Sequence, residues 1–197
     1  MKLIIMDKVI ENLSHGKVFR TTVSVLFRIY GALSIVGGVI IFFWGLVKIG
    51  DLSSSFWAGV GIFFALLINL IEGWIIFQIL GVRSDTIGAI PESDYNVVPI
   101  VAVFLKTIGE VVSVYMVLGG IALWLSAGSL SSGNSFSFPF LGGLSFLELI
   151  WLIPGAFFVL MLFYFLSECL VAVVDIARNI KEIRNIASQR DNSNKIQ

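Results

Sequence analysis

The chain has 197 residues, of which 57% are hydrophobic and only 13% carry a charge. A soluble domain of this length carries roughly a quarter charged residues, so the composition excludes an ordinary water-soluble domain. The net charge is zero and there is one cysteine and one histidine, which argues against nucleic acid binding, an intramolecular disulfide and a histidine-based metal cluster.

The N-terminal segment has the pattern of an amphipathic helix. Leu3, Met6, Val9 and Ile10 recur at helical spacing, and charged residues lie opposite them. Such a helix is expected to lie on the membrane interface rather than to cross the membrane. We therefore predict that residues 1–20 form a cytoplasmic interfacial segment.

Four long apolar blocks follow. Crossing a hydrocarbon core of ~30 Å takes roughly 20 helical residues, and each block exceeds that length. We predict an all-α integral membrane protein, an up-down bundle of four transmembrane helices within residues 21–180. The expected helices cover about residues 24–49, 56–82, 97–127 and 146–177.

An isoleucine stripe continues beyond the fourth apolar block. Ile176, Ile180, Ile183 and Ile186 are spaced three or four residues apart and are flanked by charged residues. This spacing indicates that the fourth helix extends into the cytoplasm. We predict that residues 181–197 contain this helical extension and a disordered, polar tail.

The basic residues predict the orientation. They gather before the first apolar block and after the fourth, and the connection between the third and fourth blocks has no charge. By the positive-inside rule both termini are then cytoplasmic, and we expect a prokaryotic plasma membrane. The basic residues concerned are Lys2, Lys8, Lys17, Arg20, Arg178, Lys181, Arg184, Arg190 and Lys195.

Small residues form a seam on each of the first two helices. Such seams let helix backbones approach closely, which favours packing where lipid provides no hydrophobic drive. We interpret them as structural. The first seam is Gly31, Ser34, Gly38 and Gly45, and the second is Gly61, Ala65, Asn69 and Gly73.

Five ionisable residues interrupt the apolar blocks. A charge inside a bilayer costs a few kcal/mol or more unless it is paired or hydrated, so each is a candidate functional residue. The helical rise places them in one layer of the inner leaflet, where Asn69 and Tyr164 extend the network. The five are Arg28, Glu72, Lys106, Glu110 and Glu168.

The charges of this layer do not balance. One arginine and one lysine face three glutamates, and Lys106 and Glu110 are spaced to pair within one helix. The excess carboxylate would take up a proton, recruit a cation or contact water. Glu72 and Glu168 are the expected places for it.

Two functions remain open from the sequence. The first is a non-enzymatic accessory, scaffold or assembly subunit of a membrane complex, whose partners are the lipid bilayer and either itself or another membrane protein. The alternative is an oligomeric channel or an ion- or proton-coupled transporter that uses the intramembrane carboxylates. Motifs of metalloproteases, hydrolases and phosphate loops are missing, so we expect no enzyme, no cofactor and no metal.

Overall fold

The computed structural model describes residues 17–53, 56–90, 97–130 and 146–194, and within these ranges all regular structure is helical. The first two helices are α2 (Lys17–Leu52) and α3 (Phe56–Gly88). The next segment consists of α4 (Val97–Val114), a π-helical turn η1 (Tyr115–Gly119) and α5 (Gly120–Leu130). Helix α6 (Phe146–Asn194) completes the fold. The amphipathic helix is expected within residues 1–20. Residues 1–16 of this segment lie outside the described residues.

Four helical segments are long and apolar enough to cross a membrane. They cover Val18–Asp51, Phe56–Gly88, Val97–Ser126 and Leu149–Ala187, and the third is formed jointly by α4, η1 and α5. Each exceeds the roughly 20 residues that a bilayer requires. The predicted all-helical membrane class is therefore confirmed, although most of these helices are longer than the sequence suggested.

Helices α2 and α3 pack through parts of their two small-residue seams, whereas Gly61 of the second seam packs against Leu125 of α5. The Ser34 hydroxyl donates to the Gly73 carbonyl at 3.0 Å, and a β-carbon added to Gly73 would lie 2.7 Å from the Ser34 carbonyl oxygen. Gly45, further along α2, packs on Leu66, which precedes Gly73 in α3. The two helices therefore run in opposite directions, at a backbone distance that only small residues permit.

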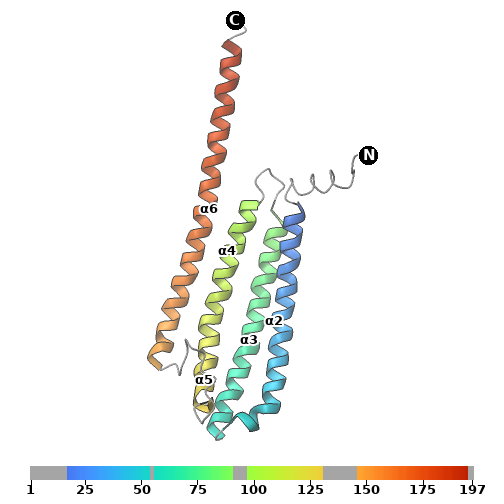
Figure 1. Ribbon diagram of the computed structural model, residues 1–197, viewed down its shortest axis with the longest axis vertical. Coiled ribbons are helices and arrows are strands. Elements are labelled where there is room, and N and C mark those ends of the chain that lie inside the picture. Colours follow the sequence, from blue (N-terminus) through green and yellow to red (C-terminus); the bar gives the residue numbers. More distant parts are fainter. Residues whose placement is uncertain (1–16, 54–55, 91–96, 131–145, 195–197) are drawn as a thin grey trace, which may run out of the picture.

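Helix α6 packs mainly on α4 (Figure 1). The Ser113 hydroxyl donates to the Ala156 carbonyl at 2.8 Å, and a β-carbon on Gly109 would lie 2.6 Å from the β-carbon of Phe163. These contacts also run in opposite directions along the two helices. In both the α2–α3 pair and the α4–α6 pair, a glycine thus allows the two helices to approach closely.

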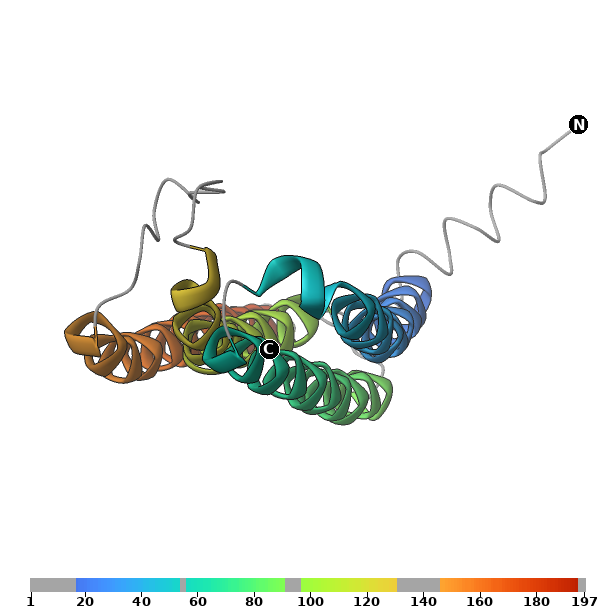
Figure 2. The ribbon, with the colours of Figure 1, turned by 90° about the horizontal axis from the view of Figure 1, so that it is seen from below.

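The helices are arranged in the order α2, α3, α4 and α6, with α2 and α6 on opposite sides (Figure 2). The core is the place where α2, α3 and α4 meet near the start of α2. It consists of buried residues from these three helices, namely Phe27, Ile76, Leu80, Ile87 and Ile100. Helix α6 contributes little to it, and most of its apolar side chains are exposed.

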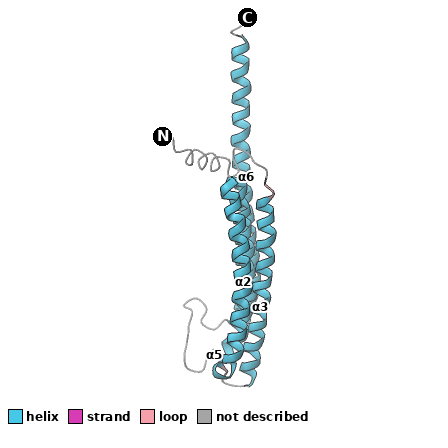
Figure 3. Cartoon of the chain, turned by 90° about the vertical axis from the view of Figure 1, so that its right-hand side faces the viewer, coloured by secondary structure: helices cyan, strands magenta, loops and turns pink. Residues whose placement is uncertain are grey.

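The last turns of α6 project beyond the other helices (Figure 3). The Lys106–Glu168 contact sets the register between α4 and α6, so residue 177 of α6 is level with Val97, the first residue of α4. The rest of α6, as far as Asn194, is about 25 Å long at 1.5 Å per residue. This part of α6 extends past the other helices of the described fold (Figure 3).

Candidate functional site

The structure places the seven candidate residues in three separate groups rather than in one contact network. Lys106, Glu110, Tyr164 and Glu168 lie together between α4 and α6. Arg28 of α2 contacts the end of α3, and Glu72 and Asn69 lie at the middle of α3.

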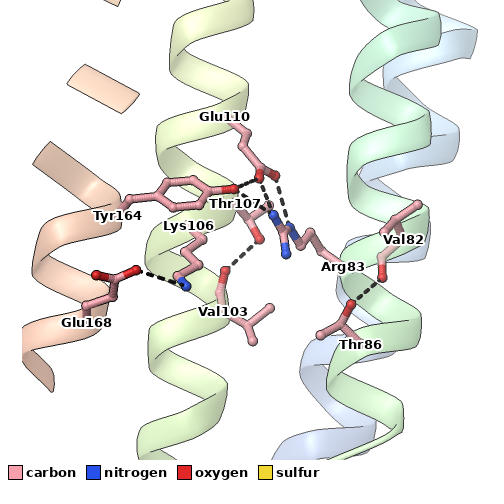
Figure 4. A network of polar contacts seen from close by, with 9 residues as sticks. All are labelled: Val82, Arg83, Thr86, Val103, Lys106, Thr107, Glu110, Tyr164 and Glu168. Carbon is pink, nitrogen blue, oxygen red and sulfur yellow. Dashed lines mark hydrogen bonds and ion pairs between the residues drawn. The ribbon is translucent and has the colours of Figure 1, made fainter. Parts of the chain in front are cut away.

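The first group is centred on Arg83, which lies one residue beyond the expected end of the second helix. Its Nε donates to Glu110 Oε2 at 3.0 Å, and its Nη2 forms an ion pair with Glu110 Oε1 and donates to the Tyr164 hydroxyl at 3.0 Å (Figure 4). The Tyr164 hydroxyl in turn donates to Glu110. We call these three residues, from α3, α4 and α6, the Arg83 clasp.

The Arg83 clasp is well sheltered and internally satisfied. The side chains of Arg83 and Glu110 are only 21% and 17% exposed. A guanidinium that meets a carboxylate through two N–H groups forms one of the stronger hydrogen-bonded pairs in proteins. Because the charges of the two groups cancel and Tyr164 bonds to both, the clasp links three helices without an unpaired charge.

Lys106 and Glu168 lie beside the clasp but are held more loosely. Their charged atoms are 4.0 Å apart, and the Glu168 side chain is 72% exposed. The Lys106 ammonium also lies 5.1 Å from the centre of the Tyr164 ring, a cation–π distance (Figure 4). Glu110 is therefore bonded to Arg83 and Tyr164, while Lys106 points to α6.

The second group joins α2 to the end of α3. Arg28 donates from Nε to the Ser84 hydroxyl at 3.1 Å and forms an ion pair with Asp85 at 2.8 Å. Ser84 is fully buried, and its hydroxyl lies 2.8 Å from that of Ser24. The Arg28 and Asp85 side chains are 66% and 72% exposed, so this ion pair is accessible, unlike the clasp.

Arg83, Ser84 and Asp85 are the contacts that sequence reasoning missed. The expected second helix ends at residue 82, whereas α3 continues to Gly88. A signal was available, because Ile76, Leu80 and Ile87 keep helical spacing through this stretch and all three are buried. The helix that carries them necessarily carries the three polar residues as well.

The third group contains two buried oxygen atoms that have no hydrogen-bond partner among the described residues. Glu72 is 3% exposed, and neither its Oε1 nor the Oδ1 of Asn69 has a hydrogen-bond partner. Both residues line a cavity of about 210 Å³ between α2, α3 and η1, together with Tyr115. Glu72 is the middle residue of α3, about 24 Å from either end at the helical rise.

The side chains of the described residues limit which metal ions or cofactors the protein could hold. Among them there is no group of three histidine, cysteine, aspartate or glutamate side chains that could hold a metal ion. The single cysteine, Cys169, is free and exposed on α6. The arrangement thus offers one satisfied ionic clasp, one accessible ion pair and one buried carboxyl group that faces a cavity.

Comparison of this chain with protein-family models, with curated proteins and with solved structures finds no match in any of the three.

Proposed function

We propose that this protein is a non-enzymatic accessory or scaffold subunit that assembles with itself, or with another membrane protein, in a prokaryotic plasma membrane. In this proposal the four apolar segments cross the bilayer up and down, and both termini are cytoplasmic. The distribution of lysine and arginine supports this orientation. The start of α2 and the end of α6 lie toward the same end of the molecule (Figure 1), which is consistent with it.

The observation that carries the proposal is the exposure of α6. Along its projecting part, Ile180, Ile183 and Ile186 are 61%, 66% and 60% exposed. The fourth apolar segment has 39 residues, more than the roughly 20 that cross a bilayer. In the proposed orientation its last turns, which carry these isoleucines, lie in the cytoplasm, outside the lipid that would cover apolar side chains. Ile176 precedes them on the same stripe and is 59% exposed.

A helix that projects this far is stabilised by packing its apolar face. Isolated helices of about 12–15 residues are marginal in water, and most helical stability comes from packing an apolar face. Isoleucines three and four residues apart form a seam of the kind that packs helices into coiled coils. We therefore propose that the Ile180–Ile183 face of α6 binds the same face of a second copy or a similar helix of a partner subunit.

The Arg83 clasp supports the same function. Its charges are compensated within one chain, as expected for residues that hold helices together. It also anchors α6 to the α2–α3 pair through α4, so that the projecting part of α6 has a rigid base. A subunit that presents a helix to a partner requires such a base.

The test compares two double variants of the full chain. Ile180→Gln with Ile183→Gln removes the apolar face, and Arg178→Gln with Glu182→Gln alters the opposite face of the same turns without changing the net charge. Two differently tagged copies are produced together, extracted in mild detergent and purified through one tag, and their mass is measured by light scattering.

We expect the wild-type chain and the Arg178–Glu182 variant to co-purify both tags as an oligomer. The Ile180–Ile183 variant should recover one tag and behave as a monomer with an unchanged helical circular dichroism spectrum. If the wild-type chain is itself a monomer and co-purifies no stoichiometric membrane subunit, or if the isoleucine variant assembles normally, the proposal is wrong.

A second candidate is an oligomeric channel or an ion- or proton-coupled transporter that uses the intramembrane carboxylates. The buried, unpartnered Glu72 favours it, because such acids occur in ion and proton pathways. Flux of protons or monovalent cations into liposomes should then depend on the protein and be abolished by Glu72→Gln. Flux that is absent, or equal in the variant, excludes this candidate.

A further inference from the structure

Two residues that line one cavity at the middle of α3 each carry a buried oxygen atom without a hydrogen-bond partner among the described residues. These atoms are Glu72 Oε1 and Asn69 Oδ1. Burying an ionised carboxylate without a partner costs several kcal/mol, which a positively charged ligand would offset. The cavity therefore has the electrostatic character of a cation site.

Part of the cavity wall has no side chain. Gly37 of α2 lines the cavity with nothing within 4 Å of its β-carbon position, and Tyr115 lines it from η1. The π-helical turn that carries Tyr115 is a local departure from the α-helix of a kind that is frequent at functional sites. An aromatic ring beside a carboxylate suits a cation with apolar substituents, because the ring face attracts positive charge.

A larger apolar groove adjoins the cavity. This groove, of about 610 Å³, lies between α2 and α4 and shares Leu33, Ser34 and Tyr115 with the cavity. The remainder of its wall is mostly aromatic and aliphatic, and includes Phe27, Tyr30, Ile76, Leu80 and Phe104. Glu72 thus lines the smaller of two adjoining spaces, which share three lining residues.

The shape and chemistry together select a class of ligand. A bare metal cation requires several oxygen ligands within about 2.6 Å, whereas most of these walls are glycine and apolar side chains. We propose that the cavity and groove bind a lipophilic organic monocation. Its positive centre lies beside Glu72 and Tyr115, and its apolar groups occupy the groove between α2 and α4.

This site is independent of the proposed assembly through α6. It is formed by α2, α3, α4 and η1 of one chain, and it needs neither a second copy nor the passage of ions. Binding should therefore persist in the monomeric Ile180→Gln, Ile183→Gln variant, which separates a failure of this inference from a failure of the proposed function.

The experiment measures binding of tetraphenylphosphonium to the full chain in lipid nanodiscs by equilibrium dialysis. Tetraphenylborate, which has the same shape and the opposite charge, is the ligand control. Glu72→Gln removes the charge at nearly constant volume, and Glu168→Gln makes the same change at an exposed position of α6. Val112→Trp fills the groove without altering the carboxyl group.

We expect saturable binding of the cation by the wild-type chain and by Glu168→Gln. Loss of a buried charge partner should weaken binding by at least about tenfold in Glu72→Gln, and Val112→Trp should also abolish it, which keeps the test decisive if one variant does not fold. Equal binding by Glu72→Gln, or equal affinity for tetraphenylborate, would overturn the inference. So would stabilisation of the wild-type chain by sodium without any binding of the phosphonium.

Discussion

Replacement of Arg83 by methionine is the sharpest test of how this protein holds its helices together. The substitution keeps an unbranched apolar side chain but removes both bonds to Glu110 and the bond to Tyr164. Glu110 is then left as a sheltered carboxylate whose remaining hydrogen bond comes from the Tyr164 hydroxyl. We expect this variant to lose stability chiefly through that uncompensated charge.

The magnitude follows from the burial of the pair. Removing one partner of a buried ion pair costs about 3–5 kcal/mol. Because the side chains of Arg83 and Glu110 are still 21% and 17% exposed, we expect the free energy of unfolding to fall by about 2–3 kcal/mol. Tyr164→Phe removes two hydrogen bonds of about 0.6 kcal/mol each and should cost about 1 kcal/mol.

Arg28→Met is the matched control. It removes an arginine from an ion pair of which both side chains are mostly exposed, 66% and 72%, so its cost should stay below about 1 kcal/mol. The double variant Arg83→Met with Glu110→Leu removes both charges of the clasp. It should recover most of the loss, because an apolar pair of similar volume replaces the buried ions.

The free energy of unfolding can be measured by titration with sodium dodecyl sulfate in mixed micelles, with far-ultraviolet circular dichroism as the signal. Equal losses in Arg83→Met and Arg28→Met would refute the reasoning, because the clasp would then be no stronger than an accessible pair. So would additive losses in the double variant, since the two residues would then act independently.

Two further predictions use glycines of known surroundings. Gly73→Ala should lower the free energy of unfolding by about 2 kcal/mol, because its β-carbon would lie 2.7 Å from a backbone oxygen, whereas Gly81→Ala, with nothing within 4 Å, should leave it unchanged or slightly higher on the same titration. For orientation, cysteine replaces Gly50 or Gly88, which are also in open space, in a Cys169→Ser background. A membrane-impermeant maleimide should label the cysteine at Gly50 in intact cells and leave that at Gly88 unlabelled; the reverse pattern contradicts the proposed orientation.

The four apolar spans were predictable because they depend on local properties. Length and hydropathy decide whether a segment can cross a bilayer, and both can be read without knowing its neighbours. The small-residue seams were predictable for the same reason, since spacing alone places Ser34 on one face of the first helix and Gly73 on one face of the second. The structure brings these two seams together with a hydrogen bond of 3.0 Å.

The polar contacts were only partly predictable. Spacing put Lys106 and Glu110 on one face of a helix, but the partner of Glu110 is Arg83, which lies 27 residues away in the chain. Long charged side chains reach between helices, so their pairing depends on which helices are neighbours and in what register. In addition, the second helix expected from the sequence ends at residue 82, so Arg83 lies outside it.

The sequence by itself determined that this is a helical membrane protein with five charges in its apolar segments, because composition and periodicity act within each helix. Tertiary structure alone decided what those charges do. The register of α3, α4 and α6 satisfies Glu110 through Arg83 and Tyr164, and the order of the helices leaves Glu72 beside a cavity with no partner for its Oε1. An imbalance of charge can be counted from a sequence, but its location depends on which side chains come within bonding distance.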